Sequence, residues 1–153
     1  MTLWDYAVAV HARAGVDEAC LELQDRHGQC VSLLLWRLWA LSEARAAGPE
    51  TLGAAASCAR VWDEAAVAPL RAARRALKAP RAPIADAARL GLRSDVAKVE
   101  LAAERVLLET LEALTPIHGG GGEAPLAALI AVAARWGNPA PDEALERLIA
   151  GAL

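Results

Sequence analysis

The segment from Cys30 to Ala46 carries apolar side chains around almost its whole circumference if it is drawn as a helix. At about 100° per residue, no broad side of this helix is left for water. Its apolar run from Leu33 to Leu41 is the longest in the chain and is interrupted only by Arg37. A helix that is apolar all round belongs in an interior, so the segment predicts a central helix surrounded by others.

The remaining sequence also favours helices. Alanine and leucine dominate, phenylalanine is absent and the 153 residues fit one domain. Alanine and leucine lose little conformational freedom in a helix, and no convincing alternating strand pattern is present. We therefore expect an all-α, single-domain fold of the orthogonal or bundle-like type, with about six to eight helices around the central one.

Glycines, prolines and capping residues mark the expected helix boundaries. The expected helices are Leu3–Arg13, Asp17 to just before Gly28, Cys30–Ala46, Glu50–Val67, Pro69–Lys78, a short Ile84–Leu90, a long helix capped by Ser94 and Asp95 and ending at Leu114, Leu126–Trp136 and Pro141–Ala150. Ala68-Pro69 is expected to break or kink the fourth helix, because proline lacks an amide donor.

The glycine run divides the chain by composition. We predict a helical core domain at residues 1–117, a Gly-rich linker at 118–125 and a C-terminal helical hairpin or tail at 126–153. The last two helices either dock on the core or form a mobile hairpin.

No catalytic, cofactor or metal residues are assigned from motifs. The three histidines are far apart, no Glu-x-x-His occurs, and the three cysteines lack a Cys-x-x-Cys pair. Cys20, Cys30 and Cys58 are predicted to be reduced thiols that pack as small hydrophobes. Glu100, Glu104, Glu109 and Glu112 are expected to form a solvated helix face, with Arg105 paired to Glu109.

The N-terminus lacks a secretory signal pattern, and no span reaches the ~20 apolar residues of a membrane helix. A cytoplasmic protein without membrane contact is therefore expected.

A basic segment stands out against the net charge of −3. It contains five cations and no acid between Glu64 and Asp86: Arg71, Arg74, Arg75, Lys78 and Arg81. Their helical spacing predicts one cationic face. This face is either an ordinary surface helix with cations near its C-terminus or an interaction face for an acidic protein partner or a phosphate-bearing ligand. Nucleic acid is disfavoured, because no aromatic residues are interleaved.

A polar cluster precedes the central helix. Gln24 is expected to point inward, His27 to lie at the helix end, and Asp25 to pair with Arg37 across the Gly28 turn. The cluster of Gln24, Asp25, His27 and Arg37 is interpreted as structural. The five tryptophans fit core packing better than a ligand-binding box, because Trp36 and Trp39 follow helical spacing.

These residues also carry a resemblance. The chain is similar to the bacterial family called domain of unknown function 2390 over roughly its first two-thirds. The residues concerned are Leu3-Trp4, Gly15-Val16, Ala19-Cys20-Leu21, Leu23-Gln24-Asp25, Gly28, Leu33-Leu34-Leu35, Trp39, Trp62, Pro69-Leu70-Arg71, Arg74-Arg75, Lys78, Glu100-Leu101 and Glu104. The resemblance implies a small cytosolic protein and no particular activity. Family members carry Asp and Asn where this chain has Cys30 and Ser32.

Two functions are compatible with the sequence. The preferred one is a non-catalytic protein-interaction or regulatory module that uses the basic face. The alternative is a small-ligand binding protein or enzyme for an anionic or acyl ligand, with a pocket lined by tryptophan and Gln24. A filled core would favour the first, and a concave apolar cavity with convergent polar groups would favour the second. A homodimer interface on leftover apolar surface is a further alternative.

Overall fold

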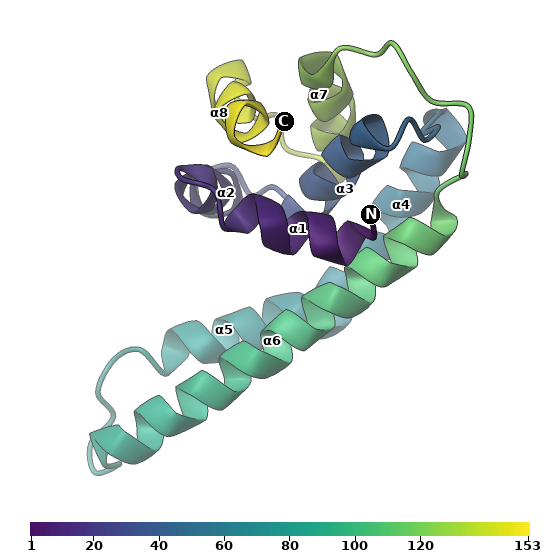
Figure 1. Ribbon diagram of the computed structural model, residues 1–153. Coiled ribbons are helices and arrows are strands. Elements are labelled where there is room, and N and C mark those ends of the chain that lie inside the picture. Colours follow the sequence, from purple (N-terminus) through teal and green to yellow (C-terminus); the bar gives the residue numbers. More distant parts are fainter.

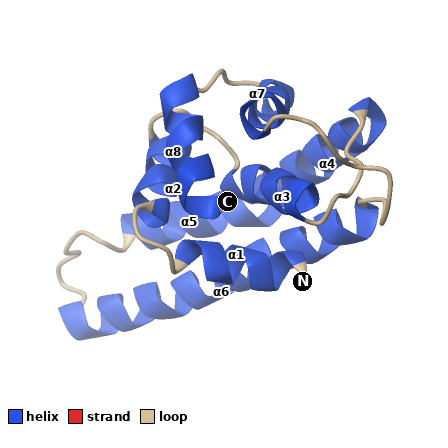
Figure 2. Ribbon diagram, turned by 45° about the horizontal axis from the view of Figure 1, so that its top comes forward, coloured by secondary structure: helices blue, strands red, loops and turns tan.

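The computed structural model describes all residues, 1–153, and contains no β-strand (Figure 2). The helices are α1 (Leu3–His11), α2 (Val16–Asp25), α3 (Val31–Ser42), α4 (Pro49–Trp62), the π-helix η1 (Asp63–Val67), α5 (Ala68–Ala76), α6 (Asp86–Leu114), α7 (Pro125–Trp136) and α8 (Asp142–Ala152). The prediction of an all-α fold is confirmed.

The helix α3 is the centre of the molecule. Every residue from 33 to 40 is buried, and Trp36 and Trp39 are fully enclosed. The surrounding helices that contact α3 are α1, α2, α4, α6 and α7. The central apolar helix predicted from the sequence is therefore present.

The other helices are arranged in layers around α3. Figure 1 shows α7 and α8 on one side of α1–α3, and the α5–α6 pair on the other. The far ends of α5 and α6 extend beyond the rest of the molecule as a helical arm. Arg89 closes the base of this arm's loop, because its guanidinium donates to the carbonyls of Leu77 (2.6 Å) and Lys78 (2.9 Å) at the end of α5. These carbonyls have no partner within the helix.

The prediction of two helices in the region 84–114 is wrong, because α6 runs without interruption from Asp86 to Leu114. Asp95 does not cap a helix start. Its carboxylate instead pairs with Lys98 one turn later, at 3.0 Å. A single helix packs along α5 and η1 and against α1, α3 and α4, and this tertiary packing outweighs the local capping signal.

The chain does not break before Pro69. It stays helical through η1 into α5, and the Ala68 amide donates to the carbonyl of Asp63, five residues earlier. Such a π-turn widens the backbone just where proline would otherwise meet the carbonyl of the preceding turn. The predicted interruption is therefore a local widening, and its first residue, Asp63, lines the cavity described below.

The C-terminal helices pack onto the other helices. They add buried side chains to the same hydrophobic core as α1–α4: Leu129, Val132, Ala133, Ala144, Leu145, Leu148 and Ala152. The helix α7 contacts α3 and α4, and α8 contacts α2.

The glycine run that leads to α7 lies against the end of α3. Gly120 N donates to Ala44 O at 3.1 Å, and Gly119 forms a bridge with Arg45. A Cβ on Gly120 would lie 2.1 Å from the Arg45 carbonyl oxygen, so only glycine fits this approach.

None of these helices combines the length and apolar character that crossing a membrane would require.

Candidate functional site

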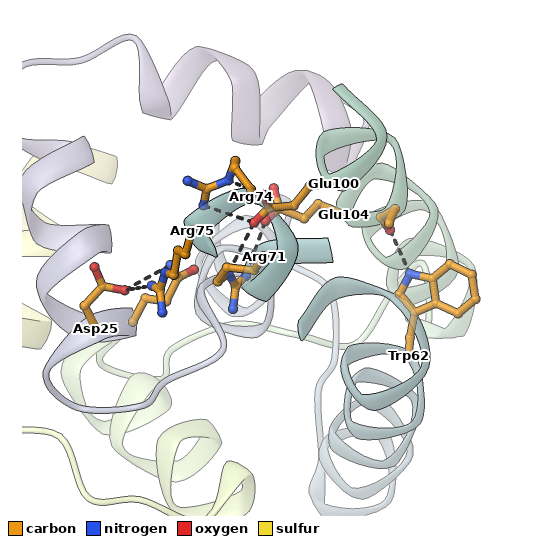
Figure 3. Close-up of polar contacts among 9 residues, drawn as sticks. Asp25, Trp62, Arg71, Arg74, Arg75, Glu100 and Glu104 are labelled. Carbon is orange, nitrogen blue, oxygen red and sulfur yellow. Dashed lines mark hydrogen bonds and ion pairs between the residues drawn. The ribbon is translucent and has the colours of Figure 1, made fainter. Parts of the chain in front are cut away.

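The basic segment does not present all of its cations to solvent. Arg71 and Arg74 of α5 both reach Glu100 of α6 (Figure 3). Arg71 Nε and Arg74 Nη2 each lie 3.3 Å from Glu100 Oε1, and Arg74 Nε donates to Oε2. Two guanidinium groups thus neutralise a single carboxylate at the centre of the α5–α6 contact.

The expectation of a solvated glutamate face on α6 is wrong for Glu100, whose side chain is only 7% exposed. Glu104, one turn later, lies 3.5 Å from Arg71 Nη2. Glu112 accepts the Leu3 amide at 2.7 Å, at the start of α1. The predicted pair of Arg105 and Glu109 is confirmed at 2.7 Å.

The remaining basic residues differ in their partners. Arg75 pairs with Asp25 of α2 (Figure 3). Arg81 Nη2 is 3.4 Å from the Ala76 carbonyl oxygen. Lys78 and Arg81 have no carboxylate partner, and both are exposed. Of the five cations in the predicted face, Lys78 and Arg81 are therefore the two whose charge is not paired with a carboxylate.

The predicted ion pair between Asp25 and Arg37 does not form. Arg37 in α3 pairs with Glu123, which follows the glycine run, and Asp25 pairs with Arg75. The α2–α3 turn directs Asp25 outward toward α5, whereas Arg37 faces the side of α3 that the 118–124 segment covers. The prediction placed an acid from across the Gly28 turn beside Arg37, whereas the fold supplies one that lies 86 residues further along the chain.

The other polar residues of this cluster occupy separate places. Gln24 is half-buried, donates to the Asp25 carboxylate at 3.3 Å and lines a cavity. His27 Nε2 lies 3.8 Å from a carboxylate oxygen of Glu22. Gln24, Asp25 and His27 thus stay together at the end of α2, while Arg37 belongs to another part of the molecule.

A cavity of about 760 Å³ adjoins several of these residues. Its walls come from α1, α2, the α2–α3 turn, α3, η1, α5 and α6, and Trp136 of α7 closes one edge. The apolar wall is formed chiefly by Trp4, Ala7, Val8, Leu21, Val31, Leu35, Val67, Ala97, Leu101, Leu107 and Leu108. The polar groups are His11, Asp17, Gln24, Gln29, Ser32, Asp63, Arg71, Arg74, Glu100 and Glu104.

The tryptophans are divided between core and cavity. Trp36 and Trp39 are core residues, as predicted, and their indole N–H groups donate to Thr115 Oγ1 (2.7 Å) and the Met1 carbonyl (3.0 Å). Trp136 is held at the cavity edge by a 2.7 Å bond from its indole N–H to the Gly28 carbonyl. Trp4 stacks beneath the Arg105 guanidinium, 5.0 Å from the ring centroid.

Burial shifts the acid–base properties of several cavity groups. It raises the pKa of Cys20 and of Cys30 to about 12, so both thiols stay protonated at neutral pH. All three cysteines are free, as predicted. Burial also raises the pKa of Asp63 and of Glu104 above their ordinary values, against the opposing effect of Arg71. No group of three or more His, Cys, Asp or Glu side chains is placed to hold a metal ion.

Comparison with known proteins identifies a family and no activity. The model of the family described as "Protein of unknown function (DUF2390)" matches residues 2–111. The chain belongs to the DUF2390 family. The part that matches DUF2390 contains every cavity residue named above except Trp136. No curated protein and no solved structure matches the chain.

Several cavity residues were not singled out by sequence reasoning. Asp63 gave no signal beyond its place before Ala68-Pro69, and Gln29 read only as part of a turn. Glu100 was visible as one of four glutamates on α6. A usable signal was the excess of cations on one helix and of acids on a neighbouring one, since opposite charges of this kind pair when helices pack.

Proposed function

We propose that the chain is a binding module for a small organic ligand, which occupies the cavity between α1, α2, α3, η1, α5 and α6. The observation that carries this proposal is the cavity itself, which combines a wide apolar wall with polar groups from six helical elements. Its volume of about 760 Å³ falls in the range of roughly 300–1,000 Å³ that is usual for ligand pockets.

Two further features support binding at this place. The π-helix η1 contributes Asp63 and Val67 to the cavity wall, and π-turns occur frequently at functional sites. Polar residues in the family resemblance also converge here from three helices. They are Gln24, Arg71, Arg74, Glu100 and Glu104.

The proposal concerns binding and not covalent catalysis. The nucleophile candidates in the cavity are Cys20 and Cys30, and their thiols are held in the protonated, unreactive form by burial.

The proposal is tested with a neutral apolar probe, 1-octanol, and a variant that fills the cavity. We expect 1-octanol to shift the indole N–H signals of Trp4 and Trp136 in a ¹H–¹⁵N spectrum, because both rings line the cavity. The signals of Trp36 and Trp39, which lie in the core, should stay in place. Ala97→Trp places a large side chain in the cavity and should abolish the shifts.

The matched control is Ala102→Trp, the same substitution at an exposed position of α6 that does not line the cavity. It should leave the 1-octanol response unchanged. A response that survives Ala97→Trp, or no response from the wild-type chain at all, contradicts the proposal.

A second candidate function, as an interaction module, is supported by the shape and charge of the helical arm. Lys78 and Arg81 are exposed near its tip and lack carboxylate partners, and Ile84, Leu90 and Leu92 expose large apolar side chains beside them. An acidic protein surface is complementary to this combination. Binding of a poly-glutamate peptide at low salt, lost in Lys78→Gln/Arg81→Gln and kept in Lys98→Gln, tests this candidate. Lys98 is the control because Asp95 already pairs with it.

A further inference from the structure

The hydrogen-bond donors of the cavity are largely used within the protein. Arg71 and Arg74 are directed to Glu100, and Arg71 also reaches Glu104 (Figure 3). The side-chain amide of Gln24 donates to Asp25. The amide of Gln29 donates to the carbonyl of Asn138. A ligand that enters this cavity therefore finds few N–H groups without a partner.

The acceptors, by contrast, are left over. Gln29 is only 4% exposed, yet its Oε1 is buried without any hydrogen-bond partner. Asp63 forms no ion pair and no side-chain hydrogen bond, and Arg71, the cation that lowers its pKa, is directed to the glutamates of α6. Glu104 has a single contact, the 3.5 Å approach of Arg71. Gln29 Oε1 is the acceptor among these that is buried without a partner, whereas Asp63 and Glu104 are half-buried. A buried acceptor without a partner is costly and is normally satisfied by a group from outside.

The cavity also carries an excess of negative charge. Four of its carboxylates, those of Asp17, Asp63, Glu100 and Glu104, face two guanidinium groups. Asp17 lies at the rim, where it is paired with His11 at 2.8 Å. Inside, the three carboxylates of Asp63, Glu100 and Glu104 stand against the two guanidinium groups of Arg71 and Arg74, which pair with the two glutamates. The charge that is not matched within the protein is therefore negative.

The two unmatched acceptors both line the cavity. Gln29 belongs to the α2–α3 turn, next to Cys30. The negative charge of Asp63 acts to raise the pKa of Cys30, which places the Asp63 carboxylate within electrostatic range of this turn. The apolar residues Trp4, Leu101 and Leu107 of α1 and α6 line the same cavity.

We propose that the ligand is an organic cation, a primary ammonium group on an apolar body, whose head is held by the Asp63 carboxylate and Gln29 Oε1 while its body lies on the apolar wall. This inference rests on the proposed function of the cavity and names its ligand class. An ammonium group donates up to three hydrogen bonds and accepts none, which is the complement of what the cavity leaves unsatisfied. An anionic ligand would be repelled by the surplus carboxylates. The guanidinium groups that could bind it, those of Arg71 and Arg74, are already paired with Glu100.

Three probes with the same eight-carbon body distinguish these classes: octylammonium, 1-octanol and octanoate. Their dissociation constants are measured on the full chain from the indole shifts of Trp4 and Trp136. We expect octylammonium to bind about tenfold more tightly than 1-octanol, since a hydrogen bond to a charged partner is stronger than a neutral one. Octanoate should bind most weakly.

The residue assignment is tested with Asp63→Asn. This variant should lower the affinity for octylammonium about tenfold, to that of 1-octanol, and leave the affinity for 1-octanol itself unchanged. Glu64→Gln, at the exposed neighbouring acid outside the cavity, is the matched control and should change neither affinity. Gln29→Met, which removes the buried acceptor, should weaken octylammonium binding without favouring octanoate.

The outcomes separate this inference from the proposed function. If 1-octanol binds and Ala97→Trp abolishes its binding, but octanoate binds as tightly as octylammonium, the cavity is a ligand site and the cation assignment is wrong. If no probe binds, both fail. The probe series on the wild-type chain decides the ligand class even if Asp63→Asn does not fold.

Discussion

Arg37, the single charge on the central helix, is paired with Glu123, which lies 86 residues further along the chain. The Arg37 side chain is only 3% exposed, and its Nε and Nη1 atoms have no hydrogen-bond partner. Glu123 therefore provides the one carboxylate that compensates a buried charge. The same segment is fixed to the end of α3 through Gly120, so the connection between α6 and α7 is held at two points.

Loss of the Glu123 carboxylate is expected to destabilise the fold. Breaking a buried ion pair from one side leaves an uncompensated charge, which costs roughly 3–5 kcal/mol, and the partial exposure of Glu123 reduces this to about 2 kcal/mol. We expect Glu123→Gln to lower the free energy of unfolding by that amount in urea denaturation. In an Arg37→Met background the same change should have almost no effect, since the buried charge is gone.

The double variant Arg37→Met/Glu123→Gln, which removes both charges, tests the same pair from the other side. Replacing a buried ion pair by well-packed apolar groups is often neutral or stabilising. Methionine also removes Nε and Nη1 of Arg37, the two buried nitrogens that have no hydrogen-bond partner. We expect the double variant to be at least as stable as Glu123→Gln. If Glu123→Gln lowers the free energy of unfolding equally in the Arg37→Met background, the loss of the ion pair is not the cause of the destabilisation.

Glu100 is expected to be the most sensitive acid of α6. Its carboxylate holds Arg71 and Arg74 between the two helices of the arm, and it is buried. Glu100→Gln should cost about 3 kcal/mol in urea denaturation, because two guanidinium groups then lose their counter-charge. The matched control is Glu109→Gln, which removes an exposed pair with Arg105 and should cost less than about 1 kcal/mol. Equal costs for the two variants would contradict the structural role of Glu100.

The sequence predicted those features of the fold that are encoded locally. The central helix could be recognised because apolar residues around its whole circumference require burial. The helices α7 and α8 were found within two residues of their observed ends. The continuity of α6 was missed, because Ser94 and Asp95 resemble a helix start and only packing against α5 shows that they are not one.

The candidate site was less predictable, because it depends on which helix faces meet. Arg71, Arg74 and Glu100 were each visible in the sequence, but their pairing joins residues 26 to 29 positions apart across a loop. Helical spacing identifies a cationic face and an acidic face without showing that they pack together. The Gln29 side chain is held by a hydrogen bond from its Nε2 to the carbonyl of Asn138, more than 100 residues away, and this leaves its Oε1 without a partner. Sequence spacing gives no indication of such a contact.

The buried thiols should react slowly. Because the pKa of Cys20 and of Cys30 is raised to about 12, only a very small fraction of either is thiolate at pH 8, compared with a free cysteine of pKa ~8.5. Alkylation by iodoacetamide at pH 8 should be slower than for free cysteine on the order of a thousandfold, because the thiolate is the reactive form. Peptide mapping by mass spectrometry measures each site separately. Fast modification of Cys30 in the folded chain would contradict its assigned environment.

Asp63 should stabilise the ligand complex at the expense of the empty protein. Burial raises its pKa in the folded state, so the folded chain binds this proton more tightly than the unfolded chain. The contribution of Asp63 to the free energy of unfolding therefore falls as the pH rises from the ordinary pKa of an aspartic acid through the raised one. At pH 7 the ionised carboxylate is a net cost, which Arg71 offsets only in part.

Asp63→Asn removes this cost and should unfold at a higher temperature than the wild-type chain at pH 7. The difference should shrink as the pH falls below the ordinary aspartate range, where the protonated carboxyl group resembles the amide. Thermal denaturation between pH 3 and pH 8 measures it, with Glu64→Gln as the exposed control. A gain in stability combined with a loss of octylammonium affinity is the signature of a residue retained for binding. A variant that is less stable than wild type at pH 7 and recovers at low pH would give Asp63 a structural role instead.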